Sequence, residues 1–242
     1  MKELLARIEE RTAAFNALPL YTFMDDERVA PEARLAFVPA LAHFVMSFAD
    51  LYGLVLREEP ARDAFQELVN AHAAEDSGHW RWFLADLGAL GHDPSMRFTD
   101  AVRFTFGPAT EQTRRLTYRI CRAALGASSL QKLVVVHCIE ATGKVSLSHA
   151  APLGHAVSGR TGKKLVYFGP HHLQTENAHT LERDDVHTTL ASIALDDATR
   201  AALRAVIDEM FDAFTAFADE LYRFARAPAP IDARRPATAS AQ

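Results

Sequence analysis

The sequence predicts an all-α fold of about seven helices in a single domain, and three observations support this prediction. Apolar residues recur at helical spacing along most of the 242 residues. The alternation typical of strands is nearly absent, since the best candidate, residues 165–168 (LVYF), is too short and isolated to form a sheet. A hydrophobic content of 49% can supply a sizeable core, which excludes a disordered chain.

Proline and glycine residues mark the ends of the expected helices in the first half of the chain. The first amphipathic helix ends near Pro19, and a loop then leads to Pro31, a residue suited to a first helical turn. Pro60 opens the next helix, whose pattern stops at Gly88, and Gly107 ends a short one. We therefore expect helices at residues 2–18, 31–57, 60–87 and 99–106, with a loop at 20–30.

The second half shows the same kinds of signal. Gly126 ends one helix, Ser128 and Ser129 cap the next, and that helix closes before Pro152. Residues 152–170, rich in Gly, Ser and Lys, are expected to form a connecting loop. The expected helices span residues 109–125, 129–150, 170–192 and 196–226. Residues 1–226 would form the domain, and the low-complexity tail 227–242 is expected to be disordered.

Composition excludes several classes of protein. A net charge of −5 and a pI near 6.1 argue against a nucleic-acid binder. Only Cys121 and Cys138 are present, which excludes a disulfide scaffold and a cysteine-based zinc site. No apolar run reaches the roughly 18 residues of a membrane span, and the charged N-terminal helix is not a signal peptide. We expect a soluble, cytoplasmic protein.

The helix expected after Pro170 carries the first candidate metal ligands. His172, Glu176 and His179 are spaced i, i+4 and i+7, which brings them to nearly the same face of an α-helix. Two imidazoles and a carboxylate on one face can surround one metal ion or two adjacent ions. A set of histidines and carboxylates without a thiolate suits iron, manganese or zinc.

Two other helices offer matching side chains. His72 and His79 are seven residues apart, again on one helical face, with Glu75 and Asp76 between them. Glu140 stands in an otherwise apolar stretch, where a carboxylate is costly to bury unless it is paired or bound to metal. Three helices with inward histidines and glutamates are the components of a dinuclear carboxylate site in a helical bundle.

Most single histidines have an ordinary structural role, on the surface or hydrogen-bonded in a core. The combined spacing on three helices is what favours a metal site over this alternative. His137 lies one turn before Glu140 and is a candidate to support the ligands. The histidines treated individually as structural are His43, His92, His137, His149, His155, His171 and His187.

The order and spacing of these residues resemble the heme-oxygenase-like diiron oxidases, a superfamily of seven-helix proteins. By position, His79 corresponds to the family's first-helix histidine and Glu140 to its lone glutamate, while His172, Glu176 and His179 correspond to its terminal triplet. His72 stands where most members carry glutamate, so the chain departs from the pattern there. The resemblance implies that His72, His79, Glu140, His172, Glu176 and His179 hold two Fe(II) ions, with Glu140 as the bridging carboxylate.

Two further segments, HxxEDxxHWxWFLxDL from residue 72 and MRFxxAxRF from residue 96, resemble the nitrile-forming branch of this superfamily. That resemblance implies O2 as cosubstrate, a peroxide-bridged intermediate, and conversion of a tryptophan-like amino acid to a nitrile. It also allows an external reductant and a homodimer. Other reactions of the superfamily, namely N-oxygenation, desaturation or C–C cleavage of an amino acid or fatty acid, stay open. Two Fe(II) ions facing only two anionic ligands would favour an anionic substrate, unless Glu75 or Asp76 supplies the missing charge.

Two other functions need consideration. A cofactor-free hydrolase of the thiaminase-II type shares this fold and would need a nucleophilic cysteine. Cys138 is the candidate, but it lies two residues before Glu140 and points about 200° away from that face. A heme carrier would need an accessible axial histidine and a large apolar slot, which clustered carboxylates do not favour.

Overall fold

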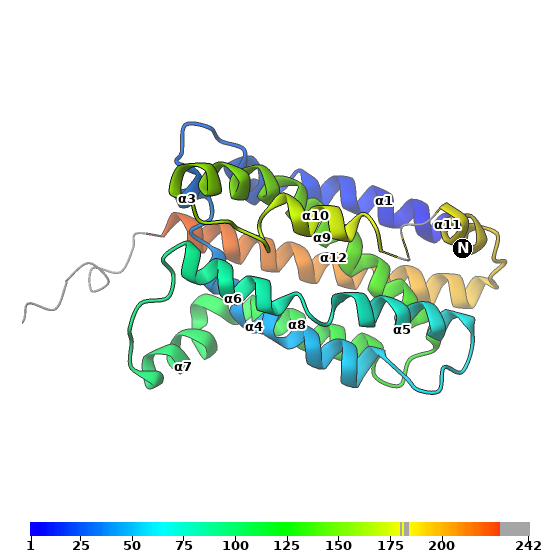
Figure 1. Cartoon of the computed structure of the whole chain (residues 1–242). Helices are drawn as coiled ribbons and strands as arrows, with labels where there is room; N and C mark the ends of the chain where they lie inside the picture. The colour runs from blue at the N-terminus through cyan, green and yellow to red at the C-terminus, as the bar shows by residue number, and fades with distance from the viewer. Residues whose placement is uncertain (180, 182–183, 228–242) are drawn as a thin grey trace, which may run out of the picture.

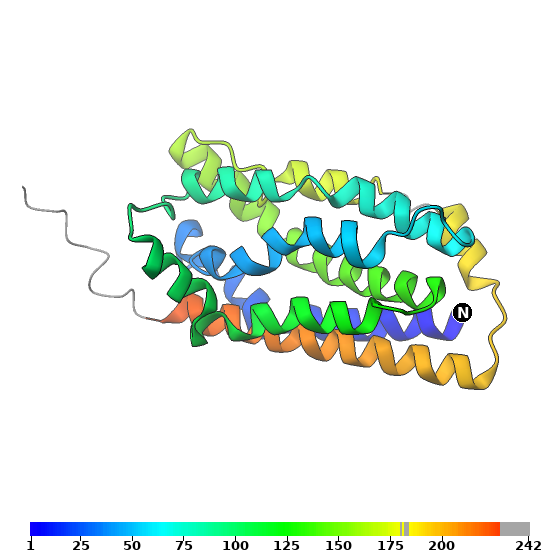
Figure 2. The ribbon, with the colours of Figure 1, turned by 90° about the horizontal axis from the view of Figure 1, so that it is seen from below.

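The computed structural model of the chain describes residues 1–179, 181 and 184–227, and this part is all-α, without a strand (Figure 1). The helices run along a common long direction, and both views show an elongated bundle (Figure 2). The elements in order are α1 (Lys2–Asn16), α2 (Pro19–Met24), α3 (Pro31–Arg34), η1 (Val38–Leu41), α4 (Ala42–Asp50), η2 (Leu51–Leu56), α5 (Ala64–Asp76), α6 (Trp80–Ala89), α7 (Phe98–Phe106), η3 (Pro108–Thr110), α8 (Glu111–Ala124), α9 (Ser129–Thr161), α10 (Pro170–Glu176), α11 (Asp184–Ala191) and α12 (Asp197–Arg226).

The core lies where α1, α8 and α9 pack against the long helix α12. Helix α12 starts at Asp196, whose carboxylate accepts the Thr199 backbone N–H, as expected for an N-cap. The inner face of α12 is apolar, and its buried residues include Leu203, Ile207, Met210, Phe211, Phe214, Phe217 and Leu221, while Val206 is partly buried. The all-α prediction is thus confirmed, although the helical segments are more numerous than the seven expected.

Several expected helices are divided in the structure. The stretch expected at 31–57 consists of α3, η1, α4 and the π-helical η2, and the loop expected at 20–30 begins with α2. The helix expected at 60–87 starts after the N-cap Asp63 and is broken at residues 77–79 into α5 and α6. The helix expected at 170–192 ends at Glu176 and resumes as α11. Helical periodicity does not detect such breaks, because the apolar pattern continues across them.

The helix expected to end before Pro152 is longer in the structure than expected. Helix α9 continues through Pro152 to Thr161 and ends at Gly162, which has the left-handed φ of 71° that favours glycine at a helix end. The connecting loop is therefore only residues 162–169. This shorter loop lies directly before α10 and, as shown below, contacts the candidate ligands. The expected tail, residues 227–242, falls outside the described residues from 228 onward.

One stretch of the described residues, Pro31–Leu56, is long and apolar enough by composition to cross a membrane, which corrects the expectation that no segment of the chain reaches this length. Half of its most apolar window is buried inside the protein. Pro39 lies within η1, and the stretch bends through four short segments rather than one straight helix. These features are compatible with a core segment of a soluble protein.

Candidate metal centre

All six ligands expected from the sequence come together at one site, and Asp76 joins them. Helix α5 supplies His72 and Asp76, the turn after it supplies His79, and α9 supplies Glu140. Helix α10 supplies His172 and Glu176, and His179 follows three residues after the helix ends. Apart from His79, whose side chain is 12% exposed, each of these residues is at most 6% exposed.

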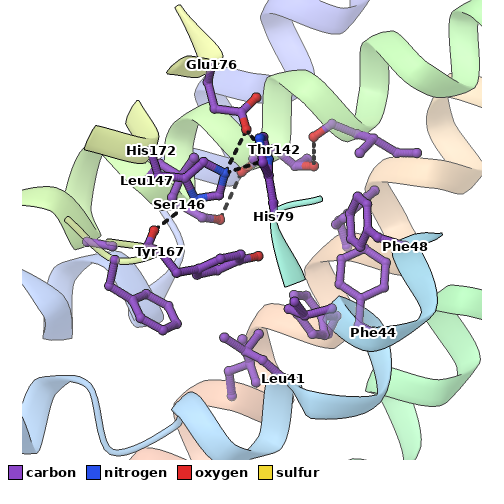
Figure 3. A pocket seen from close by; sticks show the side chains of 18 of the residues that line it. Leu41, Phe44, Phe48, His79, Thr142, Ser146, Leu147, Tyr167, His172 and Glu176 are labelled. Carbon is purple, nitrogen blue, oxygen red and sulfur yellow. Dashed lines mark hydrogen bonds and ion pairs between the residues drawn. The ribbon is translucent and has the colours of Figure 1, made fainter. Parts of the chain in front are cut away.

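We define the first group of donors as His79, His172 and Glu176, and three of their atoms lie very close together. His172 Nε2 is 2.8 Å from Glu176 Oε1 and 3.1 Å from His79 Nδ1. His79 Nδ1 is in turn 3.4 Å from Glu176 Oε1. Figure 3 shows the two imidazoles turned toward this carboxylate. One nitrogen from each histidine and one carboxylate oxygen therefore face a common point.

We define the second group as His72, Glu140 and His179. His72 Nε2 lies 3.2 Å from Glu140 Oε1, and His179 Nδ1 lies 3.7 Å from Glu140 Oε2. One donor atom from each of the three residues lies within 4.8 Å of the others, and all three residues are buried. This second group can hold a metal ion next to the first.

Asp76 and Glu176 face both groups. The Asp76 Oδ1 atom is 3.4 Å from His79 Nδ1, and its Oδ2 atom is 3.2 Å from His72 Nε2. Glu176 places Oε1 against the first group and Oε2 3.1 Å from His179 Nδ1. Glu140 contacts only the second group. Asp76 and Glu176 thus each face both groups, and the expectation that Glu140 is the bridging carboxylate stays a prediction.

A hydrogen bond to the backbone fixes the orientation of the His172 imidazole ring. Its Nδ1 lies 2.9 Å from the Tyr167 carbonyl, which can only accept, so Nδ1 carries a proton. In the neutral imidazole the Nε2 lone pair then points at the carboxylate of Glu176. Two acceptors 2.8 Å apart repel each other unless a proton or a metal ion lies between them. A backbone carbonyl that fixes the far nitrogen of a histidine is a typical support for a metal ligand.

Unsatisfied buried atoms also point to a metal. Buried donors and acceptors are nearly always hydrogen-bonded in proteins. Here five buried side-chain atoms of the cluster have no hydrogen-bond partner, even though ionisable groups lie nearby. They are His72 Nδ1, Asp76 Oδ1, Glu140 Oε2, His179 Nδ1 and His179 Nε2. The residues therefore fit a metal centre better than a network of hydrogen bonds.

Shifted pKa values reflect the dense packing of charge. Burial lowers the pKa of His72, but hydrogen bonds with Asp76 and Glu140 outweigh it and raise the pKa to about 10. For His179, burial again lowers the pKa, while Glu140 and Glu176 raise it to about 11. Burial raises the pKa of Glu176, but the nearby imidazoles of His172, His179 and His79 hold it well below its usual range. The raised pKa values of His72 and His179 show that positive charge is favoured among these carboxylates.

Two residues of the site were not assigned from the sequence. The sequence did not distinguish Asp76 from Glu75 as a further carboxylate of the site. In the structure the Glu75 Oε2 atom lies 3.9 Å from His72 Nδ1, farther than the Asp76 oxygen is from His72 Nε2. Tyr52, in the π-helical η2, donates its hydroxyl proton to Asp76 Oδ2 at 2.8 Å and lies 3.2 Å from His72 Nε2. Burial raises the pKa of Tyr52 well above its usual value, so its hydroxyl remains a donor. The spacing of Asp76 to His72 (i+4) was the available signal, whereas nothing in the sequence distinguishes Tyr52.

The helical-face argument that predicted the site was only partly right. His72 and His79 do not lie on one continuous helix, because the chain turns at residues 77–79. His179 likewise lies beyond the end of α10. The turns rotate both histidines, yet each still reaches the cluster. The six residues predicted from the sequence are therefore neighbours in the structure, but the prediction assumed too regular a backbone.

Cys138 and the other histidines whose side chains the structure describes do not belong to the cluster. His149 bonds with Asp25 and Asn16, and His43 lies 3.4 Å from the Thr117 hydroxyl. The side chain of His187 is outside the described part of the chain. Cys138 is fully buried, and burial raises the pKa of its thiol, which disfavours the thiolate that a hydrolase would need.

A cavity of about 130 Å³ adjoins the first group, and Asp76, His79, Glu140, His172 and Glu176 form part of its wall. The opposite wall is mainly aromatic and aliphatic, and Figure 3 shows Phe44, Phe48 and Leu41 facing the ligands across it. The cavity wall contains no lysine or arginine among the described residues. An apolar group can therefore be held next to the metal-binding side chains.

Comparisons with known proteins do not identify a relative, because no family model matches the chain and no curated protein is significantly similar to it.

Proposed function

We propose that the protein is an O2-dependent non-heme diiron oxidase that acts on an amino acid with an apolar side chain. The observation that supports this proposal most strongly is the pair of buried donor groups, connected by Asp76 and Glu176 beside an apolar cavity. Histidine and carboxylate donors without a thiolate suit iron, manganese or zinc, and the resemblance in the sequence favours iron. Two bound ferrous ions would supply the electrons that reduce O2.

Each part of the site has a separate role in this proposal. His79, His172 and Glu176 would hold one ion, and His72, Glu140 and His179 would hold the other. The Tyr52 hydroxyl orients Asp76 between them through its hydrogen bond. The apolar wall of the cavity keeps bulk water away from the reacting groups.

The cavity supports an amino-acid substrate in two respects. Its aromatic wall offers a place for an apolar side chain, as Figure 3 shows. Because no lysine or arginine of the described residues lines it, an anionic carboxylate would have to be neutralised by the metal ions themselves. The resemblance in the sequence further suggests a tryptophan-like substrate and a nitrile product, and we include both in the proposal.

Anaerobic titration with Fe(II) followed by exposure to O2 tests the proposal. We expect about two ferrous ions per chain, as two groups of donors require, and O2 uptake that depends on an added amino acid. Aromatic and aliphatic amino acids would be compared, and products identified by mass spectrometry. Binding of no iron, or iron binding without O2 uptake for any amino acid, would contradict the proposal.

Modified substrates test the role of the carboxylate and amine separately. Esterifying the carboxylate or acylating the amine of the best substrate should remove substrate-triggered O2 uptake. Equal activity with a fatty acid, or with an amine that lacks a carboxylate, would exclude the amino-acid assignment while leaving the diiron oxidase intact.

A further inference from the structure

Helix α6 contains a buried carboxylate outside the ligand set, that of Asp86. Its side chain is fully buried, with an exposed fraction of 0%. The Oδ1 atom accepts the backbone N–H of Val166 at 2.8 Å, and Oδ2 accepts that of Phe168 at 2.9 Å. Asp86 thus holds the loop between α9 and α10 with both of its oxygens, across about 80 residues of sequence.

The held segment contains the carbonyl that orients a candidate ligand. Tyr167 lies between the two residues bonded to Asp86, and its carbonyl accepts the proton on His172 Nδ1. The connection runs from the Asp86 carboxylate, through the backbone of residues 166–168, to the imidazole of His172. Figure 3 shows the last of these contacts, with the Tyr167 carbonyl beside the His172 ring.

The surroundings leave this loop little freedom to move. On its far side the loop packs directly on α9, where a Cβ at Gly154 would lie only 2.1 Å from the Phe168 carbonyl oxygen. The backbone N–H of Leu165 donates to the Ser158 hydroxyl at 3.0 Å. The loop is therefore held by two helices: it packs against α9, and the Asp86 carboxylate of α6 accepts two of its backbone N–H groups.

We propose that Asp86 is a positioning residue for the metal centre, which sets the orientation and proton position of His172 through the Tyr167 carbonyl. This inference rests on the proposed metal centre. Helix α6 would then organise the first group twice, since it begins at the ligand His79 and carries Asp86 two turns later. Asp86 contacts neither the substrate cavity nor a ligand directly.

Replacing Asp86 by Asn tests the proposal, because the amide keeps the shape but turns one acceptor into a donor facing a backbone N–H. We expect the affinity for Co(II), an air-stable spectroscopic probe, to fall by about 10- to 100-fold, as for other supporting partners of metal ligands. The visible absorption of bound Co(II) should also change, because the His172 ring is no longer held in place.

A matched control is available on helix α12. Glu220 is also buried and accepts the backbone N–H groups of Gln112 (2.8 Å) and Thr113 (2.9 Å), but these residues lead to no ligand. Glu220→Gln should lower the unfolding temperature as Asp86→Asn does, yet leave Co(II) affinity unchanged. If both variants weaken Co(II) binding equally, Asp86 has only a structural role and the proposal is wrong.

A double-mutant cycle shows whether Asp86 acts through His172. In the His172→Ala background, Asp86→Asn should cause no further loss of Co(II) affinity. Full additivity of the two substitutions would overturn the proposal. Either result is obtained from binding alone, without turnover.

A measurement without metal separates this inference from the proposed function. In the metal-free protein, the proton on His172 Nδ1 should give a slowly exchanging NMR resonance that Asp86→Asn abolishes and Glu220→Gln retains. Wild-type protein that binds no metal would refute the proposed function, and this resonance would still decide the positioning by Asp86. An unchanged resonance in Asp86→Asn would refute the positioning even if the metal centre is real.

Discussion

At the scale of single residues, Asp76 changes the balance of charge that the sequence suggested. Two ferrous ions bring four positive charges, and the sequence assigned only Glu140 and Glu176 to oppose them. The structure adds Asp76, with one oxygen toward each donor group. In the proposed diiron centre a single positive charge would then remain for a substrate, so a monoanion such as an amino-acid carboxylate would be a better match than a dianion.

The position of Asp76 leads to a prediction about metal stoichiometry. Asp76→Ala should weaken both metal positions, because its oxygens face His79 and His72. Glu140→Ala should weaken only the second, since Glu140 contacts that group alone. Iron content after anaerobic loading and desalting would measure the difference, and Glu75→Ala, 3.9 Å from His72, provides the control with full content. Loss of both ions in Glu140→Ala would contradict the assignment of bridges.

By the resemblance described in the sequence analysis, His72 would stand where most diiron oxidases of that superfamily carry glutamate. Its Nε2 atom lies 3.2 Å from both Asp76 and Glu140, so His72→Glu would bring three carboxylates together. Without metal this variant should be less stable than wild type, and with Fe(II) it should bind the second ion more tightly but lose the native reaction. His72→Ala should retain at most one tightly held ion. Wild-type iron content and O2 uptake in His72→Ala would show that His72 is not a ligand.

At the scale of elements, the sequence predicted which segments are helical better than where they end. The last helix was predicted to within a residue because Asp196 caps it and its apolar face is complete. The turn at residues 77–79 and the end of α10 at Glu176 were missed, since no proline interrupts either pattern. At Pro152 the error was the reverse: a helix end was predicted there, but α9 stays helical through this proline. The predicted residues still come together, because the turns at these breaks leave His79 and His179 within reach of the other side chains.

The close packing of the loop on α9 yields a stability prediction with a matched pair of glycines. A Cβ at Gly154 would lie 2.1 Å from the Phe168 carbonyl, so Gly154→Ala should cost about 1–3 kcal/mol in the free energy of unfolding. Gly159, in the same helix, is exposed with nothing near its Cβ position, and Gly159→Ala should stabilise by about 0.5 kcal/mol. Urea denaturation measures both. Equal effects would show that the loop does not press on the helix.

Gly154→Ala should also affect the metal centre. The added methyl group displaces the loop that holds the Tyr167 carbonyl against His172, so Co(II) affinity should fall together with stability. Gly159→Ala should leave Co(II) affinity unchanged. A destabilised Gly154→Ala protein with normal Co(II) affinity would show that the ligand tolerates movement of the loop.

At the scale of the whole molecule, the apolar core and the candidate metal centre differ in what would stabilise them. The core between α1, α8, α9 and α12 is built from apolar side chains, which bury without a metal. The seven candidate ligands, by contrast, place three carboxylates and four histidines in nearly buried positions. The metal-free protein should therefore be folded, with far-UV circular dichroism typical of helices, but less stable than the metal-bound protein.

The size of that difference can be predicted from linkage. At a free Co(II) concentration about 100 times the dissociation constant, binding to the folded state alone adds about 2.7 kcal/mol. For a chain of this size each kcal/mol raises the unfolding temperature by about 2–4 °C, so Co(II) should raise it by about 5–10 °C. Differential scanning calorimetry with and without a chelator measures the shift. Asp76→Ala should respond much less than wild type, because the carboxylate shared by both groups is gone. An equal shift in Asp76→Ala would mean that Co(II) stabilises the protein from another place on the molecule.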